Sequence, residues 1–152
     1  MHVEQYLGLA ENAEKNLAKA FGKVKMQHAF EPDVVEMCDK FLLWTNQHLE
    51  HIDRLAEQYK KEEDDEAEEI AEALFTTPRM GAFGMLRDLH GLWLLVHEAQ
   101  ICWIILHQAA QALRDSSLES VCRECGEHSK RETMWLLTKI KSAAPQVLVV
   151  AN

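Results

Sequence analysis

The sequence is poor in residues that interrupt helices. Glycine occurs six times and proline three times in 152 residues, and valine and isoleucine are sparse outside a few clusters. Alanine, leucine, glutamate and lysine, which favour helices, are frequent. Because sheets are enriched in β-branched residues, this composition argues against a β-rich protein. The length fits one domain, residues 1–152, and we predict an all-α fold.

The chain also lacks a concentration of positive charge. Its 16 lysines and arginines are scattered among 25 acidic residues, and the formal net charge is −9. A nucleic-acid-binding protein needs a cationic face that displaces counterions from phosphates, so we expect no nucleic-acid partner. The same net charge disfavours binding to an anionic membrane surface.

Two further features are missing. The first residues, Met1 to Gly8, lack the basic start and apolar run of a signal peptide. The most apolar stretch, residues 91–106, is interrupted by His97, Glu98 and Gln100, whereas a membrane span needs about 18 or more apolar residues. We therefore expect a cytoplasmic protein without a membrane partner, in which the four cysteines are reduced thiols.

What the sequence does contain is helical periodicity. Apolar residues recur every three or four positions in four long segments, as in amphipathic helices. Pro32 suits the first turn of the second helix, and Pro145 is expected to end the fourth. The third segment is apolar on nearly every side, which is typical of a central helix. The predicted helices span residues 3–28, 33–60, 82–114 and 118–142.

The remaining segments decide the topology. The outer two loops are short, so helices one and two, and helices three and four, should form antiparallel hairpins. The acidic connector, residues 61–79, is long enough to cross the whole bundle and should be partly helical. A plain up-down bundle with a short extra helix is the alternative. The apolar tail, residues 145–152, should lie on the bundle or on a second subunit, and with the apolar third helix it favours a homodimer.

The most informative pattern is a set of polar residues near the midpoint of each helix, on the face that points to the core. A buried carboxylate or imidazole must be hydrogen-bonded, hydrated or bound to a metal. The i, i+3 spacing of His48 and His51 places both on one helical face, near enough to share a cation, and Cys125 and His128 repeat it. The full set comprises Glu14, His48, His51, His97, Glu98, Cys125, His128 and Glu132.

This layout resembles the ferritin-like superfamily. Its di-iron members carry one glutamate on the first and third helices and Glu-x-x-His on the second and fourth. On this chain the corresponding residues are Glu14, in Ala-Glu-Lys-Asn-Leu, then His51, Glu98 and His128. His48 and Cys125 stand where that pattern has carboxylates, which leaves too few bridging groups for two metals. The resemblance therefore implies one Fe, Mn or Zn ion instead of a standard di-iron centre.

We accordingly predict a ferritin-like four-helix bundle with a non-standard metal site. If the protein is an enzyme, the expected chemistry is metal-dependent and redox, linked to stress or redox metabolism. The alternative is a metal-free structural or interaction module, in which the two histidines of the second helix hydrogen-bond to Glu14 and water. Cys122 and Cys125 are interpreted as small buried side chains. The predicted ligands are Glu14, His48, His51, Glu98 and His128, with His97, Cys125 and Glu132 as alternates or supporting residues.

Overall fold

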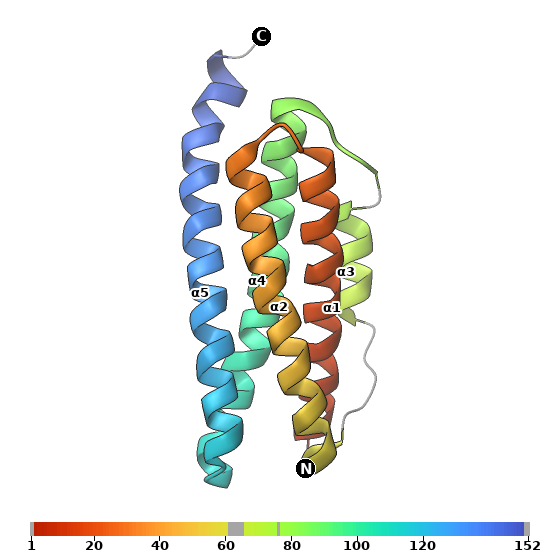
Figure 1. The fold of residues 1–152 in the computed structure, drawn as a ribbon, viewed down its shortest axis with the longest axis vertical. Coiled ribbons are helices and arrows are strands. Elements are labelled where there is room, and N and C mark those ends of the chain that lie inside the picture. Colours follow the sequence, from red (N-terminus) through yellow and green to blue (C-terminus); the bar gives the residue numbers. More distant parts are fainter. Residues whose placement is uncertain (1, 61–65, 76, 151–152) are drawn as a thin grey trace.

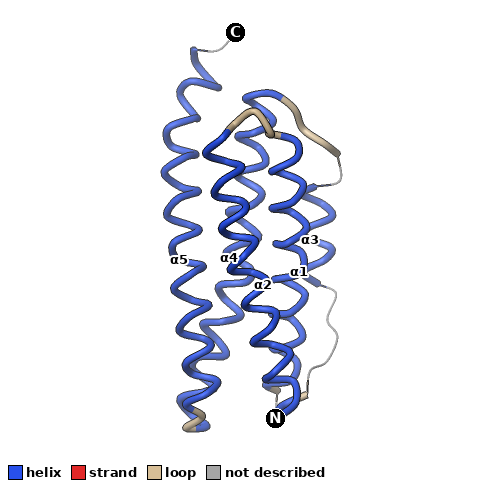
Figure 2. The backbone as a smooth tube through the Cα atoms, viewed as in Figure 1, coloured by secondary structure: helices blue, strands red, loops and turns tan. Residues whose placement is uncertain are grey.

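The computed structural model describes residues 2–60, 66–75 and 77–150, and every regular element in these ranges is helical (Figure 2). The prediction of an all-α bundle is confirmed. The first part of the predicted acidic connector, residues 61–65, lies outside the described residues. The elements are α1 (Val3–Gln27), α2 (Pro32–Tyr59), α3 (Glu66–Phe75), α4 (Gly81–Leu113), α5 (Ser116–Pro145) and the π-helical turn η1 (Gln146–Val150).

The four long helices run side by side as two antiparallel hairpins (Figure 1). In the first hairpin α1 packs on α2, and in the second α4 packs on α5. Helix α2 ends near the N-terminus of the chain, whereas α4 begins at the opposite end of the bundle. The short helix α3 lies on this path and packs against α1 and α4. Its last residue, Phe75, comes within 3.0 Å of where a Cβ on Gly91 would stand, so a larger residue there would push α3 away.

The C-terminal end differs from the sequence-based expectation. Helix α5 continues beyond residue 142 to Pro145, and the backbone then turns through η1 instead of leaving the helix. Pro145 is thus the last residue of the α-helix, as predicted, although the helix is three residues longer than the predicted end at residue 142. Proline removes only its own N–H from the helix, and the wider π turn that follows accommodates the interruption. The tail packs on α5 and α4 as a continuation of the bundle.

The hydrophobic core is divided into two clusters. One surrounds Phe21, Phe41 and Leu89, and the other surrounds Leu7 and Leu106. Between them along the helices are side chains that are polar and fully buried. They are Glu14 on α1, Thr45 and His48 on α2, and Ser129 and Glu132 on α5. A polar layer therefore crosses the bundle at mid-height.

Helix α4 is both a core element and a surface element. One face packs against α1, α3 and α5. The opposite face exposes aliphatic side chains, among them Leu94, Ile101, Ile104 and Ile105, each 36% to 48% accessible. By length and composition α4 could cross a membrane, but half of its most apolar window is buried in the protein, and core helices of globular proteins meet the same criterion.

Candidate functional site

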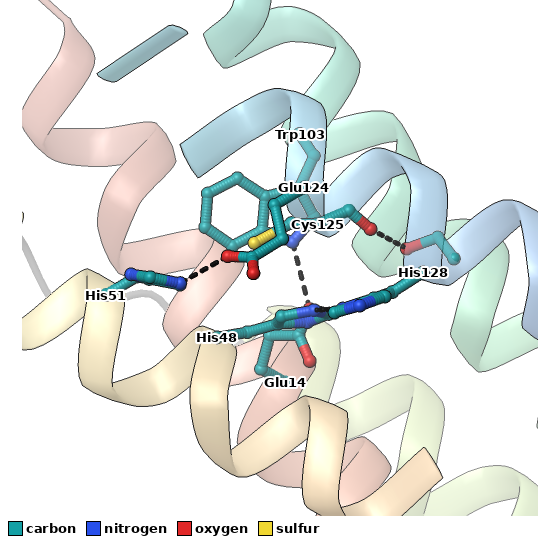
Figure 3. A network of polar contacts seen from close by, with 8 residues as sticks. Glu14, His48, His51, Trp103, Glu124, Cys125 and His128 are labelled. Atoms are coloured by element: carbon teal, nitrogen blue, oxygen red, sulfur yellow. Dashed lines mark hydrogen bonds and ion pairs between the residues drawn. The ribbon is translucent and has the colours of Figure 1, made fainter. Parts of the chain in front are cut away.

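The buried polar layer is organised around the Glu14 carboxylate. Its Oε1 atom accepts a hydrogen bond from His48 Nδ1 at 2.9 Å and another from the indole Nε1 of Trp103, also at 2.9 Å. The other nitrogen of His48, Nε2, lies 2.8 Å from Nδ1 of His128 (Figure 3). Four residues from α1, α2, α4 and α5 therefore form one chain of hydrogen bonds across the bundle.

The direction of these hydrogen bonds follows from the donors available. A carboxylate only accepts, so Nδ1 of His48 carries a proton. The second contact joins Nε2 of His48 to Nδ1 of His128, and the tautomers of the two rings decide which of them donates. Burial and, after it, the charge of His48 lower the pKa of His128, so both favour a neutral His128 ring. The His128 ring forms the partly exposed end of this hydrogen-bonded chain.

A second carboxyl group lies beside this chain. Glu132 is 1% exposed, and burial together with the negative charge of Glu14 raises its pKa well above the usual range. Both causes favour the protonated, neutral form of the Glu132 carboxyl group. The second oxygen of Glu14, Oε2, is buried and has no hydrogen-bond partner among the described residues. An unpaired buried carboxylate oxygen costs free energy, because the water that would solvate it has been removed.

An aromatic side chain packs against His128, which is the outer end of the hydrogen-bonded chain. The ring of Trp44 stacks on His128 with centroids 4.4 Å apart and planes within 3°. The Lys40 ammonium lies over the Trp44 ring, 5.2 Å from its centroid. Stacking fixes the plane of the His128 imidazole, so its Nε2 atom has a defined direction.

His51 does not take part in the central chain, although it follows His48 by one helical turn. Its Nε2 atom donates to Glu124 of α5 (Figure 3). Its Nδ1 atom accepts from Arg54. The His51 and Glu124 side chains are 20% and 44% exposed, respectively. The pair therefore links α2 to α5 at the surface, beside the buried layer.

The predicted residues of α4 lie outside the hydrogen-bonded chain. His97 bonds to Gln100 and packs edge-on against Trp93 of its own helix, and Glu98 is half-buried. Trp103 supplies the contact of α4 with Glu14 instead. Glu14 lies near the middle of α1, whereas Trp103 lies about six residues past residue 97, the middle of α4, so the two helix midpoints are not level in the bundle.

The two cysteines of α5 are buried free thiols, as interpreted from the sequence. Burial, as the main cause, raises the pKa of Cys122 to about 12. Burial and the charge of Glu14 raise the pKa of Cys125 further. Ser129 donates its hydroxyl proton to the backbone carbonyl of Cys125. Burial and the nearby negative charges thus favour the thiol form of both cysteines over the thiolate, which is the form that binds metals.

A second buried polar cluster was not predicted. At the opposite end of the bundle from the N-terminus, His28 Nε2 lies 2.7 Å from Oδ2 of Asp88, and both side chains are almost fully buried. Arg79 approaches the other oxygen of Asp88 at 3.5 Å. The detectable signal was Asp88 itself, an acid among the apolar residues of the third predicted helix.

Within the described ranges, no three His, Cys, Asp or Glu side chains are gathered in an arrangement that could hold a metal ion. The layer therefore contains suitable donor atoms that are bonded to one another. No protein-family model, curated protein or solved structure matches the chain. What the site does must consequently be argued from its own chemistry.

Proposed function

We propose that the chain is a ferritin-like, metal-associated bundle protein that binds one Fe, Mn or Zn ion in its mid-height polar layer. The arrangement of two hairpins with α3 on the path between them supports the ferritin-like part of this proposal. The position of the buried carboxylates and imidazoles between two apolar clusters supports the metal site, because ligands in helical bundles project inward from facing helices.

The observation that carries the proposal is the state of the two carboxyl groups. Glu14 has a buried oxygen without a described partner, and burial together with the charge of Glu14 favours the protonated form of Glu132. A divalent cation would pair with both groups and replace the proton of Glu132. Nε2 of His128 would be a further ligand for the same ion, and carboxylate with imidazole suits Fe, Mn or Zn.

In this assignment each residue of the layer has a distinct task. Glu14, Glu132 and His128 would hold the ion, and His48 and Trp103 would orient the Glu14 carboxylate through their hydrogen bonds. Because the donors are bonded to one another, side chains of the layer must rearrange on binding. A bound Fe or Mn ion would supply one-electron redox chemistry, and the two apolar clusters would keep bulk water away from it.

Elemental analysis of protein purified without added metal tests this proposal. Wild-type protein should retain, or take up on addition of Fe, Mn or Zn, one ion per chain, and Glu14→Gln should remove it. His51→Asn is the matched control, because it removes an imidazole from the surface pair and leaves the buried layer intact. Binding should also raise the thermal unfolding midpoint of wild type, and a chelator should reverse the rise. Absence of a stoichiometric ion before and after addition would refute metal binding.

The second candidate is a metal-free interaction module that pairs two copies of the chain through α4. It is favoured by the aliphatic face around Ile101, Ile104 and Ile105 and by the lack of a gathered metal site among the described residues. Sedimentation analysis of wild type and of Ile101→Glu tests it. A wild-type dimer that the substitution converts to a folded monomer, together with no metal, supports the module. A wild-type monomer excludes it.

A further inference from the structure

A second site candidate lies on the surface, away from the polar layer. The first half of α4, the end of α5 and η1 enclose a groove of about 480 Å³. This volume falls within the roughly 300–1,000 Å³ of small-molecule sites, which are mostly apolar with a few polar groups. The apolar lining includes Phe83, Leu86, Trp93, Leu137, Ile140 and Leu148.

The polar groups of the groove are all basic. Arg87 and His90 both line it, and their i, i+3 spacing places them on one face of α4. Neither side chain has an ion pair or a hydrogen bond to another described residue, and no acidic residue lines the groove. In a chain of net charge −9, Arg87 is a fixed positive charge on a groove whose lining is otherwise mostly apolar.

We propose that this groove binds a long-chain carboxylate, such as a free fatty acid. The Arg87 guanidinium presents paired N–H donors that match a carboxylate in a bidentate contact, and His90 adds a further donor. The hydrocarbon chain covers the apolar lining of α4 and α5. Leu148 of η1 forms one wall, so the C-terminal turn that continues past Pro145 is part of the site.

A second groove on the same molecule provides an internal contrast. It lies at the other end of α4, has a volume of about 350 Å³, and is lined by Val3, Tyr6, Leu106 and Ala109 among others. Its lining includes a histidine, His2, as that of the first groove includes His90, but it contains no lysine or arginine. It can accept a hydrocarbon chain, but it has no fixed cation with which to distinguish a carboxylate from an uncharged head group.

A second copy of the chain is a weaker occupant of the Arg87 groove. Each copy has a net charge of −9, so association brings two like-charged bodies together. A fatty acid adds only one negative charge, and its carboxylate would lie against the Arg87 guanidinium. The aliphatic face around Ile101, proposed above for subunit pairing, is not part of the lining of this groove.

Isothermal titration with dodecanoate and with dodecanol, each below its aggregation concentration, tests the proposal. Dodecanoate should bind the full-length protein at one site, and dodecanol should bind at least about tenfold more weakly, since a charge-assisted contact is lost. Arg87→Gln should reduce dodecanoate affinity to that of dodecanol. Arg123→Gln, which removes an exposed arginine from elsewhere on the molecule, should have no effect.

Leu137→Glu places a charge in the apolar part of the groove at a position that is already 42% exposed, so the protein should still fold. It should abolish dodecanoate binding while the circular dichroism spectrum is unchanged. Equal affinity for the acid and the alcohol, or affinity insensitive to Arg87→Gln, would overturn the proposal. So would a wild-type dimer that Leu137→Glu dissociates and that does not bind dodecanoate.

Discussion

Two histidine–carboxylate pairs are buried in this bundle, one at mid-height and one at an end. Glu14 and His48 lie 2.9 Å apart between α1 and α2, and His28 and Asp88 lie 2.7 Å apart between the end of α1 and α4. The pairs are similar in length and burial but differ in how completely the carboxylate is satisfied. Arg79 approaches the second oxygen of Asp88, whereas the second oxygen of Glu14 has no partner among the described residues.

Under the proposed function, this difference separates a pair that holds the fold from a pair that would receive a ligand. Asp88 has a histidine on one oxygen and an arginine on the other, so it fixes α4 to the α1–α2 turn and to the segment before α4. Glu14 accepts two hydrogen bonds on one oxygen. Its negative charge, after burial, contributes to the raised pKa of Glu132. Buried polar groups left incompletely satisfied occur preferentially at functional sites.

The largest expected effect is at the end pair. Asp88→Asn removes a buried charge that accepts from His28 and Arg79, and charged hydrogen bonds contribute about 1.5–3 kcal/mol each. We expect a loss of about 2–3 kcal/mol in the free energy of unfolding, measured by denaturant titration. Asp33→Asn is the control, because its partner Lys139 is at the surface, and it should cost less than about 1 kcal/mol. If the Asp88→Asn variant were as stable as wild type, the His28–Asp88 pair would not be what holds α4 to the α1–α2 turn.

Trp103→Phe is expected to have the next largest effect. The substitution keeps an aromatic ring but removes the indole N–H that donates to Glu14, in a fully buried position. The cost should be about 1–2 kcal/mol from the lost hydrogen bond and the smaller ring. Trp135→Phe serves as the control, because the Trp135 indole makes ring contacts without a hydrogen bond to any described residue. Equal costs for the two substitutions would mean that the Glu14–Trp103 bond contributes nothing.

How far the sequence predicts this structure depends on the range of the interactions concerned. The helices follow from local spacing and from Pro32, and their predicted ends lie within three residues of the observed ones. Glu14 and His48 were identified because a polar residue on an apolar stripe is visible within one helix. Trp103 was not identified from the sequence. Its contact with Glu14 depends on how far α4 is shifted along its axis relative to α1, which the spacing of residues within one helix does not encode.

The position of His51 and the pairing of His28 also show that the spacing of residues within one helix does not predict contacts between helices. An i, i+3 step turns the side chain by about 60° around the helix, which is enough to move His51 from the core to the seam between α2 and α5. His28 and Asp88 are 60 residues apart in the chain. Asp88 stood out on an apolar helix, but nothing in the sequence around it identified its partner.

Glu132→Gln should have a smaller effect, of opposite sign. The raised pKa of Glu132 means that the folded protein keeps a proton that the unfolded chain releases above its ordinary pKa of 4.5. Stability therefore falls as pH rises from 4.5 towards the folded pKa. Glu132→Gln removes this contribution, so with a chelator present it should raise the unfolding midpoint at pH 7 and flatten its pH dependence above 4.5. Glu127→Gln, at an exposed position, should change neither. A midpoint lowered by Glu132→Gln at pH 7 would contradict a neutral Glu132.

The smallest effect should come from Glu14→Gln, and it is the sharpest test of the comparison. Glutamine keeps an oxygen that accepts from His48 and Trp103, and it removes the negative charge that raises the pKa of Glu132. These changes oppose each other, so the free energy of unfolding in chelator should change by less than about 1 kcal/mol. Combined with Glu132→Gln it should be non-additive by about 0.5 kcal/mol or more, since the two carboxyls interact directly.

A loss as large as that of Asp88→Asn would make both pairs structural anchors. A small loss accompanied by loss of a bound ion would assign the mid-height pair to function, because stability alone does not require the charge of Glu14.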